Sequence, residues 1–563
     1  MTNKVYPFNK VDIFGLISIL ITLFITIRLG AFNGFNFGFT IGFVALLIAG
    51  ASYTFSKKCN DKIFNSLLFI CIIALCCGFS VISNSFIKFL SFIYLIFICT
   101  IFFTNLSANN NCDGSYTYIL NSIKKTFASV FDNFLLPFRS IKESAKGGKA
   151  KNILQLLIGF GISIPVLCAI IPLLTSSDIA FGTLVSSLFE NSILIILALI
   201  LSIILTPVFF GFLFSLKKED QINNNAKNIP DKISKVILNT VLGTTSIVYI
   251  AYIISQLAYI SKAFSFLLPE NYSAAQFARS GFFQMGVIAF INFVILFICS
   301  VFVTKTESKK IPASTRVLLS FLCLFTVFYI STAFVKMMKY ISLYGLTQLR
   351  VLTSVFMMML AIIFVILLIK LIFTRLKYIK AIILVCTLTM ISISVIDINT
   401  VIANYNYKAY KEGKISIDVE QIGNLGVSGL PVLVKLSEEK PLEENYDVVY
   451  EIVHNAYSIY DMGIDSLEEC TDERLVKKSV FEKNYTWEQA RIALDKFIKD
   501  NPDFDRGEYF MQFADDEFVE SETYDEYEFN KEYSPEDDFA EERFDNESLN
   551  KEITTDDNAR GTL

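Results

Sequence analysis

Eleven long apolar stretches constrain this chain more than any other feature of its sequence. Each is about 18 to 24 residues long, which is the length that an α-helix needs to cross the hydrocarbon core of a bilayer. The fold class that we predict is therefore all-α, a polytopic transmembrane bundle of about eleven helices in the cell membrane. The stretches occupy residues 11–29, 37–55, 63–82, 89–106, 153–174, 193–214, 236–259, 285–303, 317–335, 352–373 and 381–398.

Composition disfavours a soluble enzyme. Hydrophobic residues make up 53% of the 563 residues and charged residues 18%, whereas soluble proteins are about a quarter charged. The single histidine, His454, disfavours histidine-based metal sites and proton relays. The sequence also lacks a phosphate-binding glycine loop, a zinc-protease string and a nucleophile elbow. We therefore expect no cofactor, no metal site and no catalytic residue.

Basic residues are distributed unevenly among the loops between the apolar stretches. Loops on one side hold 24 Lys and Arg residues, and loops on the other side hold six. Basic residues in short loops stay in the cytoplasm, so the N-terminus is predicted to be cytoplasmic and, after eleven spans, the C-terminal region outside. Because topology explains the dispersed basic residues, we expect no binding of nucleic acid. The expected partner is the lipid bilayer, and the sequence does not indicate which proteins bind to this one.

Charge and hydropathy divide the chain into five predicted parts: a four-span segment at 1–106, a cytoplasmic segment at 107–152, a seven-span domain at 153–398, a small helical extracytoplasmic domain at 399–502 and an acidic tail at 503–563. In the second part, apolar residues recur at helical spacing and predict an amphipathic helix, either on the inner leaflet or packed on the bundle. The tail holds 22 acidic and five basic residues, and this repulsion favours disorder.

Two helices are expected in the small C-terminal domain. One covers residues 418–436 and is interrupted by three glycines and Pro431. The other begins at a capping box formed by Thr486 and Gln489, and its apolar face continues to the region of Pro502.

A polar stripe runs along the stretch at 236–259, where Thr245, Tyr249, Tyr252, Gln256 and Tyr259 recur every three or four residues. An unpaired phenol or amide in hydrocarbon costs several kcal/mol, so this stripe should face protein or a wet cavity. One interpretation is a helix–helix interface joined by hydrogen bonds. The other is a substrate path.

Further polar and cationic residues lie in the second half of the bundle, towards the predicted outer surface. Such cations are suited to an anionic ligand or a lipid headgroup; the alternative is that they only reach lipid phosphates and pair with the acidic C-terminal region. The candidate ligand-binding residues are Tyr249, Tyr252, Gln256, Tyr259, Arg279, Gln284, Asn292, Tyr329, Lys336, Lys339, Tyr340 and Arg350.

Several short strings in this region resemble a known family. They are Ala278-Arg279-Ser280-Gly281-Phe282, Tyr344-Gly345-Leu346-Thr347 followed by Arg350, and Asn404-Tyr405-Asn406. They look like bacterial membrane proteins catalogued as domain of unknown function 4153/4173, and the resemblance covers residues 153–436. It implies a multispanning membrane protein with a short exported tail, and it carries no known activity.

The predicted function is that of a non-enzymatic membrane protein with an outward-facing, cationic, tyrosine-lined site. It is either a transporter-like carrier or a component of envelope sensing. The alternative from another class is an envelope-modifying transferase, in which the outer cations hold a lipid-linked phosphate donor. That alternative lacks a convincing catalytic acid at the membrane edge.

Overall fold

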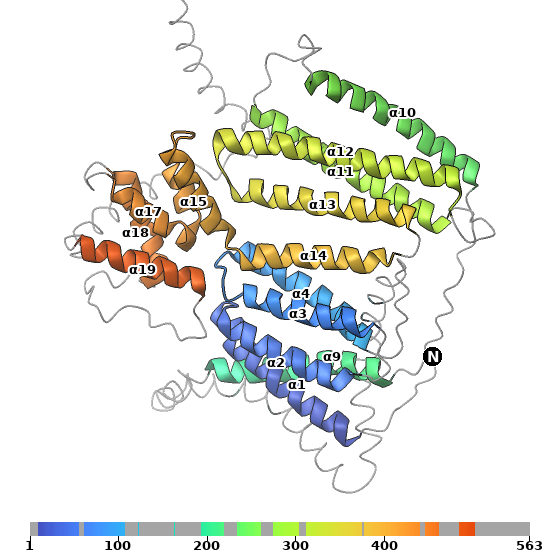
Figure 1. The fold of residues 1–563 in the computed structure, drawn as a ribbon. Helices are drawn as coiled ribbons and strands as arrows, with labels where there is room; N and C mark the ends of the chain where they lie inside the picture. The colour runs from blue at the N-terminus through green and yellow to red at the C-terminus, as the bar shows by residue number, and fades with distance from the viewer. Residues whose placement is uncertain are drawn as a thin grey trace, which may run out of the picture. The chain divides into compact units, whose positions relative to one another are not determined.

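The computed structural model describes residues 9–55, 61–106, 193–218, 234–260, 274–302, 311–373, 376–439, 445–460 and 484–501, with four isolated residues between 122 and 170. Within these ranges the chain forms helices and connecting turns and no strand, as the predicted all-α class requires (Figure 1).

Six of the apolar helices pack around one hydrophobic core. Its buried side chains include Leu47, Ile72, Phe103, Phe210 and Ile383. The helices are α1 (Lys10–Leu29), α2 (Phe37–Thr54), α3 (Lys62–Gly78), α4 (Ser85–Leu106), α9 (Ile193–Lys218) and α14 (Tyr378–Val395), with a short helix η1 (Ala31–Asn33) after α1.

A second hydrophobic core is formed by four helices, α10 (Lys235–Ile260), α11 (Ala274–Phe302), α12 (Ala313–Tyr344) and α13 (Gln348–Ile372). Leu322, Cys323, Met357 and Phe364 are buried in it. Helices α11, α12, α13 and α14 follow one another side by side (Figure 1). Helix α14 therefore contacts the second core through α13 and the first core through α3 and α4.

This packing does not follow the order of the chain. Helices α1 to α4 come from the predicted four-span segment at 1–106, and α9 and α14 come from the predicted seven-span domain at 153–398. These six helices share one core. Helix α14 packs along α13 and also contacts α3 and α4, so its neighbours come from both ends of the described chain.

Ten of the eleven predicted stretches coincide with helices, and the stretch at 153–174 lies outside the described residues except for residues 163 and 170. Within the described part, eight helices are long and apolar enough to cross a membrane, and residues 62–78 and 284–299 form shorter apolar helices. Large apolar side chains such as Phe14, Ile247 and Phe290 are exposed along them, as expected where lipid replaces water. The exact number of spans stays a prediction.

The end of α4 lies next to the second half of α9. The ring of Phe103, near the end of α4, lies 5.8 Å from that of Phe209 in the second half of α9. At the end of α9, the Lys217 ammonium lies 3.9 Å from the centre of the Tyr53 ring near the end of α2. The C-terminal parts of α2, α4 and α9 therefore lie together, and the number of spans between α4 and α9 stays a prediction.

The C-terminal described helices are short. The helix expected over residues 418–436 is divided into three pieces at its glycines, and the Asp418 carboxylate caps the first by accepting the Gln421 N–H at 2.9 Å. The elements are α15 (Ile398–Lys411), α16 (Val419–Gly423), η3 (Gly426–Ser428), α17 (Leu430–Ser437), α18 (Tyr446–Tyr460) and α19 (Tyr485–Asp500).

The predicted capping box at Thr486 is wrong by two residues. Asn484 caps α19, because its Oδ1 accepts the backbone N–H of Trp487 at 2.8 Å. Asparagine is as good an N-cap as threonine, and Thr486 instead lies in the first turn with its hydroxyl directed at Val81. The predicted apolar face is correct, since Trp487, Leu494 and the residues between them on that face are buried.

The chain forms two compact units. The first contains residues 1–462 and 473–497, and with them all the helices above up to Phe497; the second contains residues 463–472 and 498–563. The predicted boundary at residue 399 lies inside the first unit. The amphipathic helix expected within 107–152 and the tail at 503–563 fall outside the described residues, and the five-part division stays a prediction.

The packing of α14 on α4 can be tested by a disulfide. The hydroxyls of Ser91 and Ser394 lie 2.7 Å apart, which places the two Cβ atoms near the separation that a disulfide needs. We expect the Ser91→Cys/Ser394→Cys variant to cross-link on mild oxidation, detected by mass spectrometry of the joined peptides. The control pair Ser91→Cys/Ser392→Cys should not, because Ser392 is exposed. Equal cross-linking of both pairs would contradict this packing.

Candidate functional site

Asp397, two residues after the end of α14, is the centre of a hydrogen-bonded junction. Its carboxylate accepts the Asn399 N–H at 3.2 Å and the Thr400 hydroxyl at 2.6 Å, and in this way it caps α15. The same carboxylate accepts the hydroxyl of Ser428, from η3, at 3.0 Å. Thr486, from α19, lies equally close at 3.0 Å. One side chain thus contacts three separate C-terminal segments.

The junction also includes the turn between α3 and α4. The backbone N–H of Tyr485 donates to the Ser80 carbonyl at 2.9 Å, and that of Thr486 donates to the Val81 carbonyl at 3.2 Å. We call Asp397, Thr400, Ser428, Thr486 and Val81 the Asp397 junction. Hydrogen bonds to an ionised carboxylate are stronger than neutral ones. The junction therefore ties the C-terminal helices to the ends of α14 and α3.

A second contact joins α15 to the turn between α12 and α13. The Leu346 N–H donates to Asn406 Oδ1 at 2.7 Å, and Asn406 Nδ2 donates back to the Leu346 carbonyl at 2.9 Å. Gly345 precedes Leu346 with φ of +74°, and a Cβ there would lie 2.7 Å from Asn406 Oδ1. Only glycine combines this backbone conformation with so close an approach.

Arg350 holds the same turn from the α13 side. Its Nη1 donates to the carbonyls of Tyr344 at 2.8 Å and Gly345 at 2.7 Å, and its Nη2 donates to the Tyr340 hydroxyl at 3.1 Å. The guanidinium carbon lies 4.2 Å from the centre of the Tyr340 ring. Two of the predicted ligand-binding residues, Tyr340 and Arg350, therefore contact each other, and the arginine contributes donors to its own turn.

Four other predicted residues meet inside the second core. The Tyr249 hydroxyl donates to Asn292 Oδ1 at 2.7 Å, and Asn292 Nδ2 donates to the Thr326 hydroxyl at 2.8 Å. The rings of Tyr252 and Tyr329 lie 5.1 Å apart. These contacts join α10, α11 and α12, which is the geometry of a hydrogen-bonded helix interface. A ligand-binding role for the four stays a prediction.

The remaining predicted residues are dispersed. Lys336 and Gln256 are half-buried, whereas Lys339 and Gln284 are exposed. Tyr259 and Arg279 lie in α10 and α11, and their side chains fall outside the described part of the chain. Tyr329 and Tyr340 are about 16 Å apart along α12, given a rise of about 1.5 Å per residue. The described contacts thus form two separate groups along α12.

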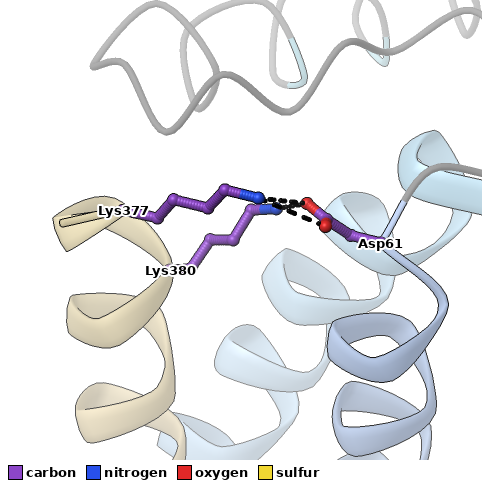
Figure 2. Close-up of polar contacts among 3 residues, drawn as sticks. All are labelled: Asp61, Lys377 and Lys380. Atoms are coloured by element: carbon purple, nitrogen blue, oxygen red, sulfur yellow. Dashed lines mark hydrogen bonds and ion pairs between the residues drawn. The ribbon is translucent and has the colours of Figure 1, made fainter. Parts of the chain in front are cut away.

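At its other end, α14 carries an ion cluster that the sequence analysis missed. Figure 2 shows the Asp61 carboxylate, just before α3, facing the ammonium groups of Lys377 and Lys380, which both reach it from the start of α14. The Lys377 Nζ lies 3.3 Å from the carboxylate, and Lys380 donates a close hydrogen bond to it. That bond lowers the pKa of Asp61 below its ordinary value. We call these three residues the Asp61 cluster.

Sequence signals existed for parts of these sites. Asp397 lies near the end of the apolar stretch at 381–398, and the polar residues Asn399 and Thr400 come after it, a pattern typical of a helix N-cap. Asp61 is an isolated acid in a basic loop, but its partners are more than 300 residues away along the chain. Positive-inside topology already accounted for each lysine, so nothing in the pattern indicated the pairing.

A comparison of the sequence with models of known protein families shows which family the chain belongs to. Residues 69–436 match the model of the family described as Domain of unknown function (DUF4153). The chain belongs to this family. The DUF4153 match begins inside α3, so the start at residue 153 expected from the resemblance was too late. The match includes most of α3 and all of α4, which pack on α14. No curated protein and no solved structure matches the chain.

The matched DUF4153 region contains the polar contacts described for Asp397, Ser428, Arg350 and Asn406. Asp61 and Thr486 lie outside it. The partners of α14 at its two ends therefore come partly from beyond the family region.

The contact between Asn406 and Leu346 predicts a loss of stability. Replacing Asn406 by Ala leaves the Leu346 N–H and carbonyl without this partner, so we expect the free energy of unfolding to fall by about 1 to 3 kcal/mol. Asn404→Ala is the matched control, because Asn404 is exposed and donates to the Thr400 carbonyl of its own helix. Thermal unfolding midpoints in detergent, followed by a thiol-reactive dye, measure the difference. Equal midpoints for the two variants would show that this contact is unimportant.

Proposed function

We propose that this protein is a non-enzymatic, multi-pass protein of the cell membrane that senses the state of the envelope through its C-terminal helices. The observation that carries the proposal is the Asp397 junction. One carboxylate just beyond the end of α14 accepts hydrogen bonds from α15 and η3 and lies 3.0 Å from the Thr486 hydroxyl of α19, which ties these segments to the end of that helix.

The position of α14 makes this connection useful for signalling. Helix α14 contacts α13 of the second core and α3 and α4 of the first. A displacement of the C-terminal helices, transmitted through Asp397, would therefore act where the two cores meet. Because packed cores have discrete arrangements rather than continuous ones, a small shift at such a position can be amplified.

The orientation that we propose places the N-terminus in the cytoplasm and the C-terminal helices outside. The excess of lysine and arginine in the loops on the N-terminal side supports this orientation. The helix ends support it as well. Lys62 begins α3, Lys217 lies at the end of α9 and Lys377 precedes α14, and these are the ends of the helices remote from the Asp397 junction. The C-terminal helices are then exposed to the envelope.

A transporter-like carrier is the second candidate, and one observation favours it. Tyr249, Asn292 and Thr326 form a polar network within the membrane-spanning helices α10 to α12. Lys336 lies half-buried farther along α12. The transferase alternative has less support, because Arg350 contributes its donors to the carbonyls of its own turn.

The orientation predicts the behaviour of reporter fusions. Alkaline phosphatase fused after residue 500 should be active, because this enzyme folds only outside the cytoplasm, and the same fusion after residue 220 should be inactive. A fluorescent protein that folds only in the cytoplasm should give the opposite pattern. Phosphatase activity after residue 220 together with none after residue 500 would reverse the orientation.

The sensing role predicts a specific effect of Asp397→Asn. The amide still caps α15 but loses the negative charge, so amide hydrogen exchange in 419–437 and 485–497 should accelerate by about tenfold, the effect of about 1.4 kcal/mol. Cells with this variant at unchanged protein amount should also differ from wild type in survival of osmotic downshift.

Asp418→Asn is the matched control, because Asp418 is exposed and caps α16 by its bond to Gln421. It should change neither readout. The sensing proposal fails if Asp397→Asn cells survive like wild type although exchange accelerates. Uptake of an anionic solute by reconstituted vesicles, lost in Lys336→Gln, would favour the carrier instead.

A further inference from the structure

We propose that the Asp61 cluster binds the headgroup of an anionic phospholipid. The inference is independent of the sensing role, because it concerns the opposite end of α14. It begins from the charges: one carboxylate, Asp61, faces the ammonium groups of both Lys377 and Lys380. A single negative charge offsets only one of these two positive charges.

Two more lysines add to this excess. Lys62 follows Asp61 directly and is exposed. Lys370, in the last turn of α13, donates to the Leu376 carbonyl at 3.2 Å, and its ammonium lies 5.5 Å from the Tyr378 ring. The described segments that carry the Asp61 cluster, 61–64 and 376–380 with the end of α13, thus contain two further lysines besides Lys377 and Lys380. Such a concentration of positive charge between membrane helices is typical of sites for acidic lipid headgroups.

The two lysines of the Asp61 cluster have different surroundings. The Lys380 side chain is 8% exposed, and its ammonium lies 5.0 Å from the Phe64 ring, so it is held in place beneath the surface. The Lys377 side chain is 56% exposed. Lys380 can keep its bond to Asp61 while Lys377 turns towards an incoming phosphate. A phosphate here would also lie near the N-terminal ends of α3 and α14, which carry partial positive charge.

Apolar side chains beside the cluster favour a lipid over a free anion. Ile63 is 88% exposed, and Ile372 and Phe373, at the end of α13, are also exposed. Exposed apolar residues next to ammonium groups match the structure of a phospholipid, in which acyl chains lie beside a phosphate. Lysine is suited to this depth because its stem contacts hydrocarbon while its ammonium reaches the headgroup.

The experiment measures lipid retention by native mass spectrometry of the full-length protein in detergent. The probes are phosphatidylglycerol, phosphatidylcholine and inorganic phosphate. We expect phosphatidylglycerol to be retained more strongly than phosphatidylcholine, and Lys377→Gln to reduce its retention by about fivefold. Lys377→Arg should restore it. Lys408→Gln, a change of an exposed lysine on α15, is the control and should bind like wild type.

Asp61→Asn separates lipid binding from a purely structural ion pair. Removing the competing carboxylate should increase phosphatidylglycerol retention, provided that the variant keeps the wild-type unfolding midpoint. If that midpoint falls, the Lys377 variants decide, because Lys380 still pairs with Asp61 in them. Unchanged retention in Lys377→Gln would overturn the proposal. Retention of inorganic phosphate equal to that of phosphatidylglycerol would also overturn it, since the ligand would then be a free anion.

Discussion

The structure depends on how helix α14 is held between two hydrophobic cores. Its apolar faces pack on α13 on one side and on α3 and α4 on the other. Its polar groups are paired at intervals, with Thr387 bound to Tyr94 and Ser394 bound to Ser91. In a membrane no water is present to satisfy such groups, so each pair strongly favours one packing of α14. The Asp61 cluster and the Asp397 junction then hold the two ends.

The Asp397 junction gives the C-terminal helices a defined connection to the bundle. Its partners Thr400, Ser428 and Thr486 come from three segments that approach one carboxylate. The bonds between Asn406 and Leu346 provide a second connection at the α12–α13 turn. Both connections involve residues inside the matched DUF4153 region. An arrangement with two such connections can transmit a movement of the C-terminal helices to both cores, and this is the physical basis of the proposed sensing role.

Sequence periodicity predicted part of the candidate site. The three- and four-residue spacing of Tyr249 and Tyr252 placed them on one face of a helix, and the cost of an unpaired phenol in hydrocarbon required partners for them. The partners, Asn292 and Tyr329, were selected as candidates, but the sequence carried no information on which groups meet. Arg350 shows that charge alone does not predict a binding site. Its charge indicated an anion site, whereas its planar group of donors is engaged by two carbonyls of the turn before it.

The sequence by itself determined the class of fold, the family and most helix positions, because apolar stretches of bilayer length and short loop strings are local properties. It also indicated the breaks in the helix over 418–436, since glycine and proline act on their own neighbourhood. Only the tertiary structure decided that α9 and α14 join the first four helices, that Asn484 rather than Thr486 caps α19, and that Asp61 pairs with Lys377 and Lys380. These features join residues far apart in the chain or choose between equivalent local caps, and both depend on which surfaces pack together.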